Sequence, residues 1–481
     1  MTVPVFEKVL IGGEWVSADQ GSYQITNPAS GEPAGYAPSC SVAQVRAATA
    51  AARRAFGPWA ALSLSERAGL LRKAAEKFRL AMGSLVDLTI AETGAVRAVA
   101  EPQQVGAVAV RLAKYAEMAA GSPDEPLPVR ELNGTIHNGM AVREPIGVVA
   151  CITPFNFPMT NCAGKIGPAL ACGNTVVVKP APVDPLGVAE LCRIVAAELP
   201  PGVVNFVNGP GPELGEALVE SPDVDMISFT GSTEVGLRIQ EVAAKRLKRT
   251  LLELGGKSAQ IVFADADREK ALRSAAQVWT FHSGQICVAG TRLLIEASIY
   301  DEFVQQLVAF AAKLKIGDPR EAGVVMGPLV SAAHRDRVEA CVQKGVAEGA
   351  KLACGGQRPA HLAQGAFYEP TLFTNVRNDM TIAREEVFGP VIAAIPFRDE
   401  AEAIAIANDS DFGLYGYVWS RDTAKALRVA RGLRTGAVHI NGSTMNNDGP
   451  FGGYKLSGIG RDGGRYVLNA YSELKYIGWT A

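Results

Sequence analysis

Short apolar runs alternate with helical stretches between residues 146 and 255, and this alternation constrains the fold more than any other feature of the sequence. The run "IGVVACIT" is almost continuously apolar, which is typical of a parallel strand buried on both faces of a sheet. The strands "TVVVK" and "VDMISFTG" follow, each separated from the last by helical stretches. Strand–helix repetition with short loops predicts a doubly wound α/β sheet that binds ligands at the carboxyl ends of its strands.

The other parts of the chain carry different patterns. A chain of 481 residues exceeds the ~250–300 at which single cores stop growing, so we expect more than one domain. Residues 41–118 have apolar side chains at helical spacing, and residues 256–455 mix helices with strands. Two extended runs flank Asn133-Gly134, which predicts a projecting hairpin because both arms are polar. The tail at 466–479 alternates like an exposed strand, and with the hairpin it predicts an edge-pairing surface between subunits.

Composition excludes several functional classes. The 47 basic and 49 acidic residues give a net charge of −2, so no electrostatic footprint for nucleic acid or an anionic membrane is present. Glu7 and Lys8 interrupt the first apolar run, and no run approaches the ~18 residues of a membrane span, so we expect neither a signal peptide nor an anchor. Eight cysteines without a CxxC pair and five histidines without a cluster predict a cytoplasmic protein with no metal site.

Two segments carry candidate catalytic side chains. In "FHSGQICVAGTR", Cys287 lies among small residues, as either a buried small side chain or a nucleophile. In "TLLELGGKS", Glu253 follows an apolar strand, where desolvation would raise its pKa as a general base requires; the alternative is a surface glutamate.

Three further positions suit ligand groups. Asn156 in "TPFNFP" is held by two prolines as an amide donor for an oxyanion, unless it only makes an Asx-turn. Lys179 ends a buried strand, where it meets either a ligand or solvent. Gly231-Ser232 opens a helix whose N-terminus suits a phosphate, although a plain strand–helix turn has the same pattern.

Six motifs together resemble one family. The segments "PFNFP", "FTGSTEVG", "LELGGKS", "GQIC", "EEVFGPV" and "PFGGYKLSGIGR" occur in the order found in the NAD(P)-dependent, hydrolytic aldehyde dehydrogenase superfamily. The resemblance runs from about residue 8 to the C-terminus. It implies a Rossmann-like cofactor domain (1–122 and 146–255), an α/β catalytic domain (256–455) and a small β oligomerisation ribbon (123–145 and 456–481). It also implies a homodimer or homotetramer.

The same resemblance implies a mechanism. Cys287 would attack the aldehyde to give a thiohemiacetal, with its oxyanion held by Asn156 and the Cys287 backbone N–H. Hydride transfer to the nicotinamide would leave a thioester, and Glu253 would activate the water that hydrolyses it to the carboxylic acid. Lys165 and Asp462 match positions of a proton relay to that base. Asp462 stands where glutamate is common, which puts the relay's strength in doubt.

The cofactor implied is NAD, with NADP possible. Pro182 stands where the family often has a glutamate that repels a 2′-phosphate, yet no arginine lies beside it to bind that phosphate. The matching cofactor positions are Ile152, Thr153, Pro154, Phe155, Asn156, Lys179, Ala181, Pro182, Gly211, Phe229, Gly231, Ser232, Val235, Leu254, Gly255, Glu386 and Phe388.

The matching substrate positions are all apolar. They are Phe157, Met159, Phe281, Ile286, Val288, Met445 and Phe451. Dicarboxylic semialdehydes require a cation for the distal carboxylate, so an aromatic or medium-chain aliphatic aldehyde is favoured as the small-molecule partner. Three alternatives remain: a CoA-acylating semialdehyde dehydrogenase, a thiol esterase with a vestigial nicotinamide site, and a non-catalytic homologue.

Overall fold

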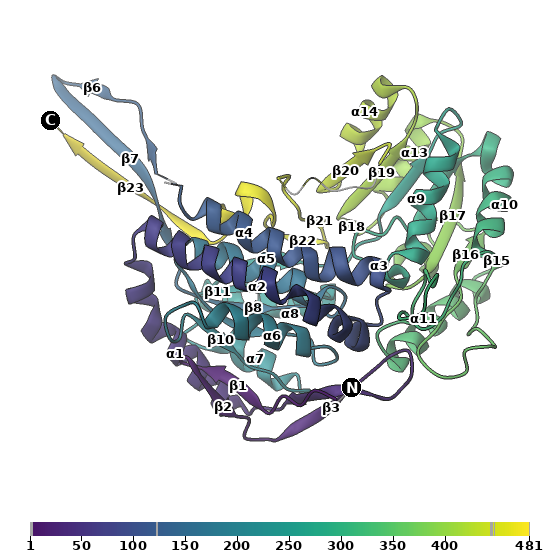
Figure 1. Ribbon diagram of the computed structural model, residues 1–481. Coiled ribbons are helices and arrows are strands. Elements are labelled where there is room, and N and C mark those ends of the chain that lie inside the picture. The colour runs from purple at the N-terminus through teal and green to yellow at the C-terminus, as the bar shows by residue number, and fades with distance from the viewer. Residues whose placement is uncertain (1–2, 122–123, 443–445, 447, 481) are drawn as a thin grey trace.

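The computed structural model describes residues 3–121, 124–442, 446 and 448–480, and it forms two lobes and a ribbon (Figure 1). The first lobe is built on an eight-stranded sheet of order β2-β1-β10-β9-β8-β11-β12-β22. Its outer strands are β1 (Lys8–Ile11) and β2 (Glu14–Ser17) at one edge and β22 (Gly458–Ile459) at the other. Its five central strands are parallel: β8 (Val148–Ile152), β9 (Thr175–Lys179), β10 (Val204–Phe206), β11 (Met226–Thr230) and β12 (Arg249–Glu253). The chain runs outward from β8 to β10 and then returns to place β11 on the other side of β8. Ligands bind at such a switch point in doubly wound sheets.

Helices cover both faces of this sheet. Val149 and Cys151 of β8 pack into one hydrophobic cluster, whereas Val148 and Ala150 pack into another, because successive strand residues point to opposite faces. The first cluster includes α2 (Leu64–Thr93), α4 (Ala107–Met118), α5 (Pro158–Ala171) and α6 (Leu186–Ala196); the second includes α1 (Val42–Ala60), α7 (Glu213–Glu220) and α8 (Thr233–Ala244). The predicted helical character of 41–118 is confirmed, and a π-helical segment, Ala100–Gly106, precedes α4.

The second lobe has a seven-stranded sheet of order β15-β16-β17-β14-β13-β19-β20. Its strands are β13 (Ala259–Val262), β14 (Arg292–Glu296), β15 (Lys351–Cys354), β16 (Thr371–Thr374), β17 (Val391–Phe397), β19 (Tyr415–Trp419) and β20 (Ala437–Ile440). Its helices are α9 (Arg268–Thr280), α10 (Tyr300–Ala311), α11 (Ala332–Ala347), α12 (Thr381–Arg384), α13 (Glu400–Asn408) and α14 (Thr423–Gly432). All pairs in this sheet except β15–β16 are parallel. The lobe is therefore the second α/β unit that the mixed pattern of 256–455 predicts.

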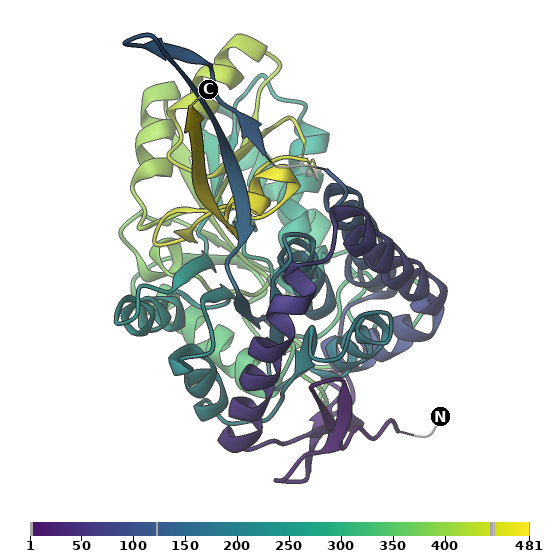
Figure 2. The same ribbon diagram turned by 90° about the vertical axis from the view of Figure 1, so that its left-hand side faces the viewer.

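The predicted hairpin is present and projects from the molecule (Figure 1). Asn133 and Gly134 both have positive φ, at 53° and 78°, between β6 (Arg130–Leu132) and β7 (Thr135–Pro145). The C-terminal strand β23 (Ser472–Thr480) pairs antiparallel with β7 over its whole length, and Figure 2 shows the two side by side. We call the sheet of β5 (Glu125–Pro126), β6, β7 and β23 the ribbon.

Two expectations for the C-terminal segment are wrong. The strand predicted over 466–479 begins only at Ser472, because Gly464–Asn469 form a 3₁₀ helix whose Val467 is buried in the first lobe. The ribbon predicted to include all of 456–481 also begins later. Residues Gly458–Ile459 form β22, which pairs with the edge of the first sheet beside Glu253.

None of the described helices is both long and apolar enough to cross a bilayer. Within the same described ranges, no three His, Cys, Asp or Glu side chains gather as metal ligands would.

Candidate active site

A cavity of about 1120 Å³ opens at the switch point of the first sheet and takes its other walls from the second lobe. Its lining includes residues that end β8, β9, β11 and β12, together with Cys287, Glu386 and Phe388 of the second lobe. Most of the predicted site residues are therefore brought together in one place. The exceptions are Lys165, Gly211 and Met159, which do not line the cavity, and Met445, which lies outside the described residues.

The loop that carries Cys287 is sharply bent. Three successive residues before it, His282, Ser283 and Gly284, have φ of 55°, 53° and 77°. A side chain at Gly284 would place its Cβ 2.1 Å from the Gly389 carbonyl oxygen, so glycine is required there. The buried Gln285 side chain holds the bend, because its Oε1 accepts a hydrogen bond from Val330 N (2.9 Å) and its Nε2 donates to His282 O (3.0 Å).

Asn156 is fixed beside this loop. Its Nδ2 donates a hydrogen bond to Gln285 O (2.8 Å), two residues before Cys287. The backbone carbonyl of Asn156 accepts a hydrogen bond from Gln104 Nε2 (3.1 Å). Only 5% of Asn156 is exposed. An amide group is thus held rigidly next to the cysteine, as an oxyanion donor must be.

The environment of Cys287 favours the protonated thiol over the thiolate. Burial raises its pKa to about 12, and the charges of Glu386 and Glu253 act in the same direction. The backbone N–H groups of Cys287 and Val288 oppose this effect, because they lie where they can donate to the sulfur. N–H groups that donate to the sulfur also lie near an oxygen on the carbon atom to which the sulfur becomes bonded.

Glu253 ends β12 and lines the same cavity. Its backbone pairs with Thr230 of β11 on one side and Gly458 of β22 on the other. Burial, followed by the charge of Asp462, raises its pKa well above the ordinary 4.5 of a glutamic acid, while Lys165 opposes the shift. Neither carboxylate oxygen accepts a hydrogen bond from a described residue, so the carboxyl group is available to take a proton.

Lys165 lies behind the cavity wall. It is 1% exposed, and its Nζ donates to Ser228 Oγ (3.2 Å), which lies 2.7 Å from the hydroxyl of the buried Tyr471. Burial lowers the pKa of Lys165, and Asp462, Cys151 and Glu253 oppose that shift. Asp462 lines the cavity, so one buried electrostatic cluster links it to Glu253 and Lys165.

Lys179 and the Gly231-Ser232 turn also line the cavity. Lys179 is 7% exposed at the end of β9; burial lowers its pKa, while Cys40 and Glu213 raise it. Ser232 caps α8, with its Oγ accepting from Val235 N (3.4 Å). A Cβ at Gly231 would lie 2.4 Å from the Phe229 ring, so the turn must carry glycine. A helix N-terminus and a buried cation in one cleft suit phosphate and ribose hydroxyls.

Glu386 lies against the Gly255-Gly256 turn after β12. Its Oε1 accepts from Gly256 N (2.8 Å), and a Cβ at Gly255 would stand 2.5 Å from its Oε2. Burial raises the pKa of Glu386 to about 7. Phe388 packs edge-on against Phe155 at 5.5 Å between ring centroids, with a left-handed φ of 56° that is rare for a bulky residue. This carboxyl group and the glycine turn leave space for a sugar near Cys287.

Aromatic side chains line another part of the cavity wall. The Phe157 and Phe281 rings stack with centroids 5.9 Å apart, and Ile286, Val288 and Phe451 complete the apolar wall. Met159 is not part of it: it is fully buried in the core of the first lobe, with its sulfur against Gly187. The helix position of Met159 turns its side chain inward, which sequence alignment to a motif does not reveal.

The expectation that this end lacks a cation is wrong. Arg111 and Lys114 of α4 line the cavity together with Thr160 and Asp462. Both cations lie in a long helical segment without a motif, so no local sequence signal separates them from the helix's solvent-exposed charges. Gly211 also departs from prediction, because Pro212 and Gly215 line the cavity in its place.

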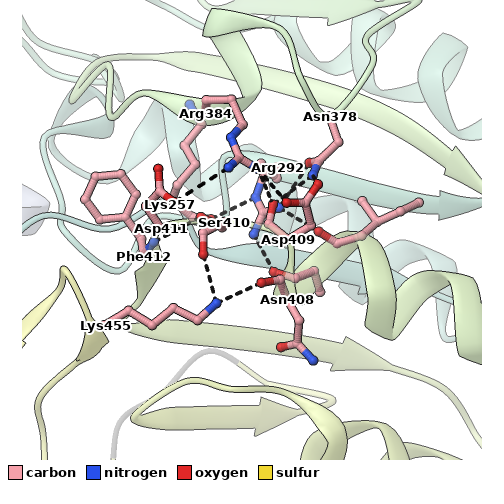
Figure 3. A network of polar contacts seen from close by, with 12 residues as sticks. Lys257, Arg292, Asn378, Arg384, Asn408, Asp409, Ser410, Asp411, Phe412 and Lys455 are labelled. Carbon is pink, nitrogen blue, oxygen red and sulfur yellow. Dashed lines mark hydrogen bonds and ion pairs between the residues drawn. The ribbon is translucent and has the colours of Figure 1, made fainter.

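A network around two cations of the second lobe, the buried Arg292 and the exposed Lys455, lies at the end of α13, and the sequence pattern does not reveal it. Arg292 donates to Ile406 O (2.8 Å) and Ala407 O (2.7 Å), the last carbonyls of α13 (Figure 3). Lys455 donates to Asn408 O and Ser410 O at 2.7 and 2.8 Å. These cations donate to carbonyl groups at the C-terminal end of α13 that lack partners within the helix, and their charge stabilises the negative end of the helix dipole.

Lys455 in this network is also the anchor of the segment that lies over Glu253. It belongs to β21 (Tyr454–Lys455), which pairs with β18 (Phe412–Gly413). Three residues before Lys455, a Cβ at Gly452 would lie 2.8 Å from Glu253 Oε1. The network therefore fixes a glycine at the point where any side chain would displace the carboxyl group.

Comparison with known proteins agrees with this geometry. The model of the aldehyde dehydrogenase family matches residues 15–477. Betaine aldehyde dehydrogenase of Bacillus subtilis is 42% identical, with 98% of this chain and 97% of the relative covered. Succinate-semialdehyde dehydrogenase [NADP(+)] of Escherichia coli is 38% identical, with 98% and 97% covered. The solved NAD+ complex of an aldehyde dehydrogenase from Bacillus cereus superposes with a TM-score of 0.94 at 38% identity, covering 98% of this chain and 96% of that one. The chain belongs to the aldehyde dehydrogenase family.

Proposed function

We propose that this protein oxidises an aldehyde with an apolar, aromatic or medium-chain body to its carboxylic acid, using NAD+ in preference to NADP+. The observation that carries the proposal is the hydrogen bond from Asn156 Nδ2 to Gln285 O, which holds an amide donor beside Cys287. Glu253 lies in the same cavity without a hydrogen-bond partner among the described residues. A nucleophile, an oxyanion donor and a base are the groups that covalent aldehyde oxidation requires.

The first step joins the Cys287 sulfur to the aldehyde carbon. Because burial keeps the thiol protonated, its proton must leave as the sulfur attacks, and Glu253, whose pKa is raised, is able to accept it. The carbonyl oxygen becomes an oxyanion between Asn156 Nδ2 and the Cys287 backbone N–H. Removing one such donor costs about 10²–10³ in rate.

The residues around Glu386 and Lys179 would hold the dinucleotide, which supplies the hydride acceptor when bound. The fit rests on the glycine turn at Gly255 and on the capped start of α8, where added side chains would fill the cleft. Pro182 lines the cavity and offers no carboxylate that would repel the 2′-phosphate of NADP+. Its carbonyl accepts a hydrogen bond from Tyr23 OH (2.8 Å). We infer a modest preference for NAD+.

The second half-reaction hydrolyses the thioester. Glu253 takes a proton from water, the hydroxide adds to the acyl carbon, and the thiolate of Cys287 leaves with the electron pair of the C–S bond. Lys165 and Asp462, which share the buried cluster with Glu253, are inferred to pass the proton onward. Water is the acyl acceptor in this proposal because the base is retained, which disfavours the CoA-acylating alternative.

We further propose that the chain acts in the cytoplasm as a homodimer or homotetramer joined through the ribbon. Four large apolar side chains on β23 are exposed in the single chain: Leu474, Tyr476, Ile477 and Trp479. An exposed apolar strand of this kind is normally covered by a partner.

One experiment tests the activity and separates the alternatives. A panel of aldehydes is mixed with the protein and either NAD+ or NADP+, and both reduced cofactor and acid product are measured. We expect equal amounts of NADH and acid without CoA. Acid release from an ester without NADH from any aldehyde would identify a thiol esterase, and a requirement for CoA would identify the acylating enzyme.

A further inference from the structure

The Arg111 guanidinium forms no ion pair with any residue that the structure describes. It is half-buried on α4 and lines the same cavity as Phe157 and Phe281. Its one hydrogen bond to a described residue runs from Nη1 to Thr160 O (3.2 Å), and it forms no ion pair within the described ranges. Arginine is always charged, so this leaves most of its donors for a group that enters the cavity.

The chain makes room for this guanidinium at Gly164 of α5. A Cβ at Gly164 would lie 2.4 Å from Arg111 Nη1, closer than any real contact. Gly164 is helical and needs no left-handed backbone, so the absence of a side chain serves the arginine and not the turn of the helix. The Asp462 carboxylate lies 3.6 Å from the same point, but no ion pair joins it to Arg111.

Lys114, one turn further along α4, is differently placed. It forms an ion pair with Asp448, so its charge is already balanced within the protein. Of the two cations that line the cavity on α4, Arg111 is the one that forms no ion pair with a described residue. A partly desolvated charge without a partner is unfavourable, and a bound anion would relieve it.

We propose that Arg111 binds a carboxylate at the far end of the substrate, so that the substrate class is aldehydes in which an apolar spacer separates the carbonyl from a terminal carboxylate. The stacked Phe157 and Phe281 rings hold the spacer, and the planar guanidinium suits a carboxylate in bidentate geometry. This inference rests on the proposed function and refines its substrate. It replaces the argument against anionic substrates, which depended on the absence of a cation.

The test uses substrate pairs that differ mainly in the carboxylate. The pairs are 4-carboxybenzaldehyde with 4-methylbenzaldehyde, and 6-oxohexanoate with hexanal. The measured quantity is the ratio of kcat/KM for the acid to kcat/KM for its neutral partner. We expect the wild-type protein to prefer the acid in at least one pair. In Arg111→Gln the ratio should fall at least about tenfold, as loss of a charge-assisted hydrogen bond implies, mainly through KM.

Three further variants test the assignment to Arg111. Gly164→Ala keeps the charge but forces the guanidinium from its place, and it should also lower the ratio. Arg72→Gln removes an exposed arginine of α2, outside the cavity, and should leave the ratio unchanged. Lys114→Gln removes a cavity charge that Asp448 already balances, and the ratio should change less than about threefold.

The outcomes separate this inference from the proposed function. A wild-type preference for both neutral aldehydes, or an equal loss for both members of a pair in Arg111→Gln, would overturn carboxylate recognition. A loss in Lys114→Gln as large as that in Arg111→Gln would overturn the assignment to Arg111. In each case continued NADH production from the neutral aldehydes would leave the proposed function standing, whereas no NADH from any aldehyde would overturn the proposed function itself.

Discussion

At the scale of single residues, Glu253 helps to hold the thiol of Cys287 in its protonated form. Burial raises the pKa of both groups, and the charge of Glu253 adds to the effect on Cys287. The resting site therefore stores a proton that must move when the thiol attacks.

Replacing Cys287 with serine should lower dehydrogenase kcat by at least about a thousandfold, because a hydroxyl in this environment ionises even less readily than the thiol. Binding of NAD+, measured by calorimetry, should survive. Cys354→Ser is the matched control, since Cys354 is a half-buried thiol of β15 outside the cavity. A serine variant that keeps a tenth of the activity would contradict the covalent mechanism.

Replacing Glu253 with glutamine should slow thioester hydrolysis more than hydride transfer. A rapid burst of about one NADH per active site, followed by slow turnover, is expected in stopped-flow experiments. In the wild-type protein, hydrolysis should weaken as pH falls through the Glu253 pKa, which lies above 4.5 because burial favours the protonated acid, and the variant should lose this dependence. Glu241→Gln, on the exposed face of α8, should behave as wild type. Loss of the burst itself would show that Glu253 acts before hydride transfer.

At the scale of elements, strand ends were predictable from the sequence and helix faces were not. Lys179 and Glu253 each end a buried strand as predicted, because parallel strands have a clear apolar signature. Met159 and Arg111 lie on helices, where a rotation of one residue decides between core and cavity. The alternation predicts a strand over 466–469, where the chain is helical, because alternation does not record that Val467 reaches a core made by distant residues.

The loop after β9 carries the prediction on cofactor choice. Pro182→Glu should lower kcat/KM for NADP+ at least tenfold, because a carboxylate in a partly desolvated cleft repels a 2′-phosphate, while the value for NAD+ should hold or improve. Pro182→Ala is the control that removes the ring without adding charge, since loss of the fixed φ alone affects the loop. Equal losses for both cofactors in Pro182→Glu would mean that this position does not face the ribose.

At the scale of the whole molecule, two lobes supply opposite walls of one cavity. The first lobe gives Asn156 and Glu253, and the second gives Cys287 and Glu386, so neither sheet alone makes a site. The sequence pattern predicts two α/β units along the chain, but it does not predict that the two lobes lie close together. Their closeness depends on contacts such as that of Asn156 with Gln285, which join residues far apart in the chain.

The ribbon should carry the subunit contact. Leu474 and Tyr476 lie on one face of β23 and are 62% and 67% exposed, so a Leu474→Glu/Tyr476→Glu double variant should lower the molar mass seen by light scattering. Leu80→Glu, which changes an equally exposed side chain of α2, should leave the mass unchanged. An unchanged mass in the double variant would place the interface elsewhere.

The burial of Cys287 also determines how the resting protein meets peroxides and alkylating agents. Such reagents react with the thiolate form of cysteine, and a thiol with a pKa of about 12 is almost fully protonated at neutral pH. The charges of Glu386 and Glu253, which help to keep the thiol protonated, therefore also slow its oxidation to sulfenic acid. The nucleophile is thereby kept reduced between turnovers without a resolving disulfide partner, and its reactivity is confined to the moment when an aldehyde is present to receive it.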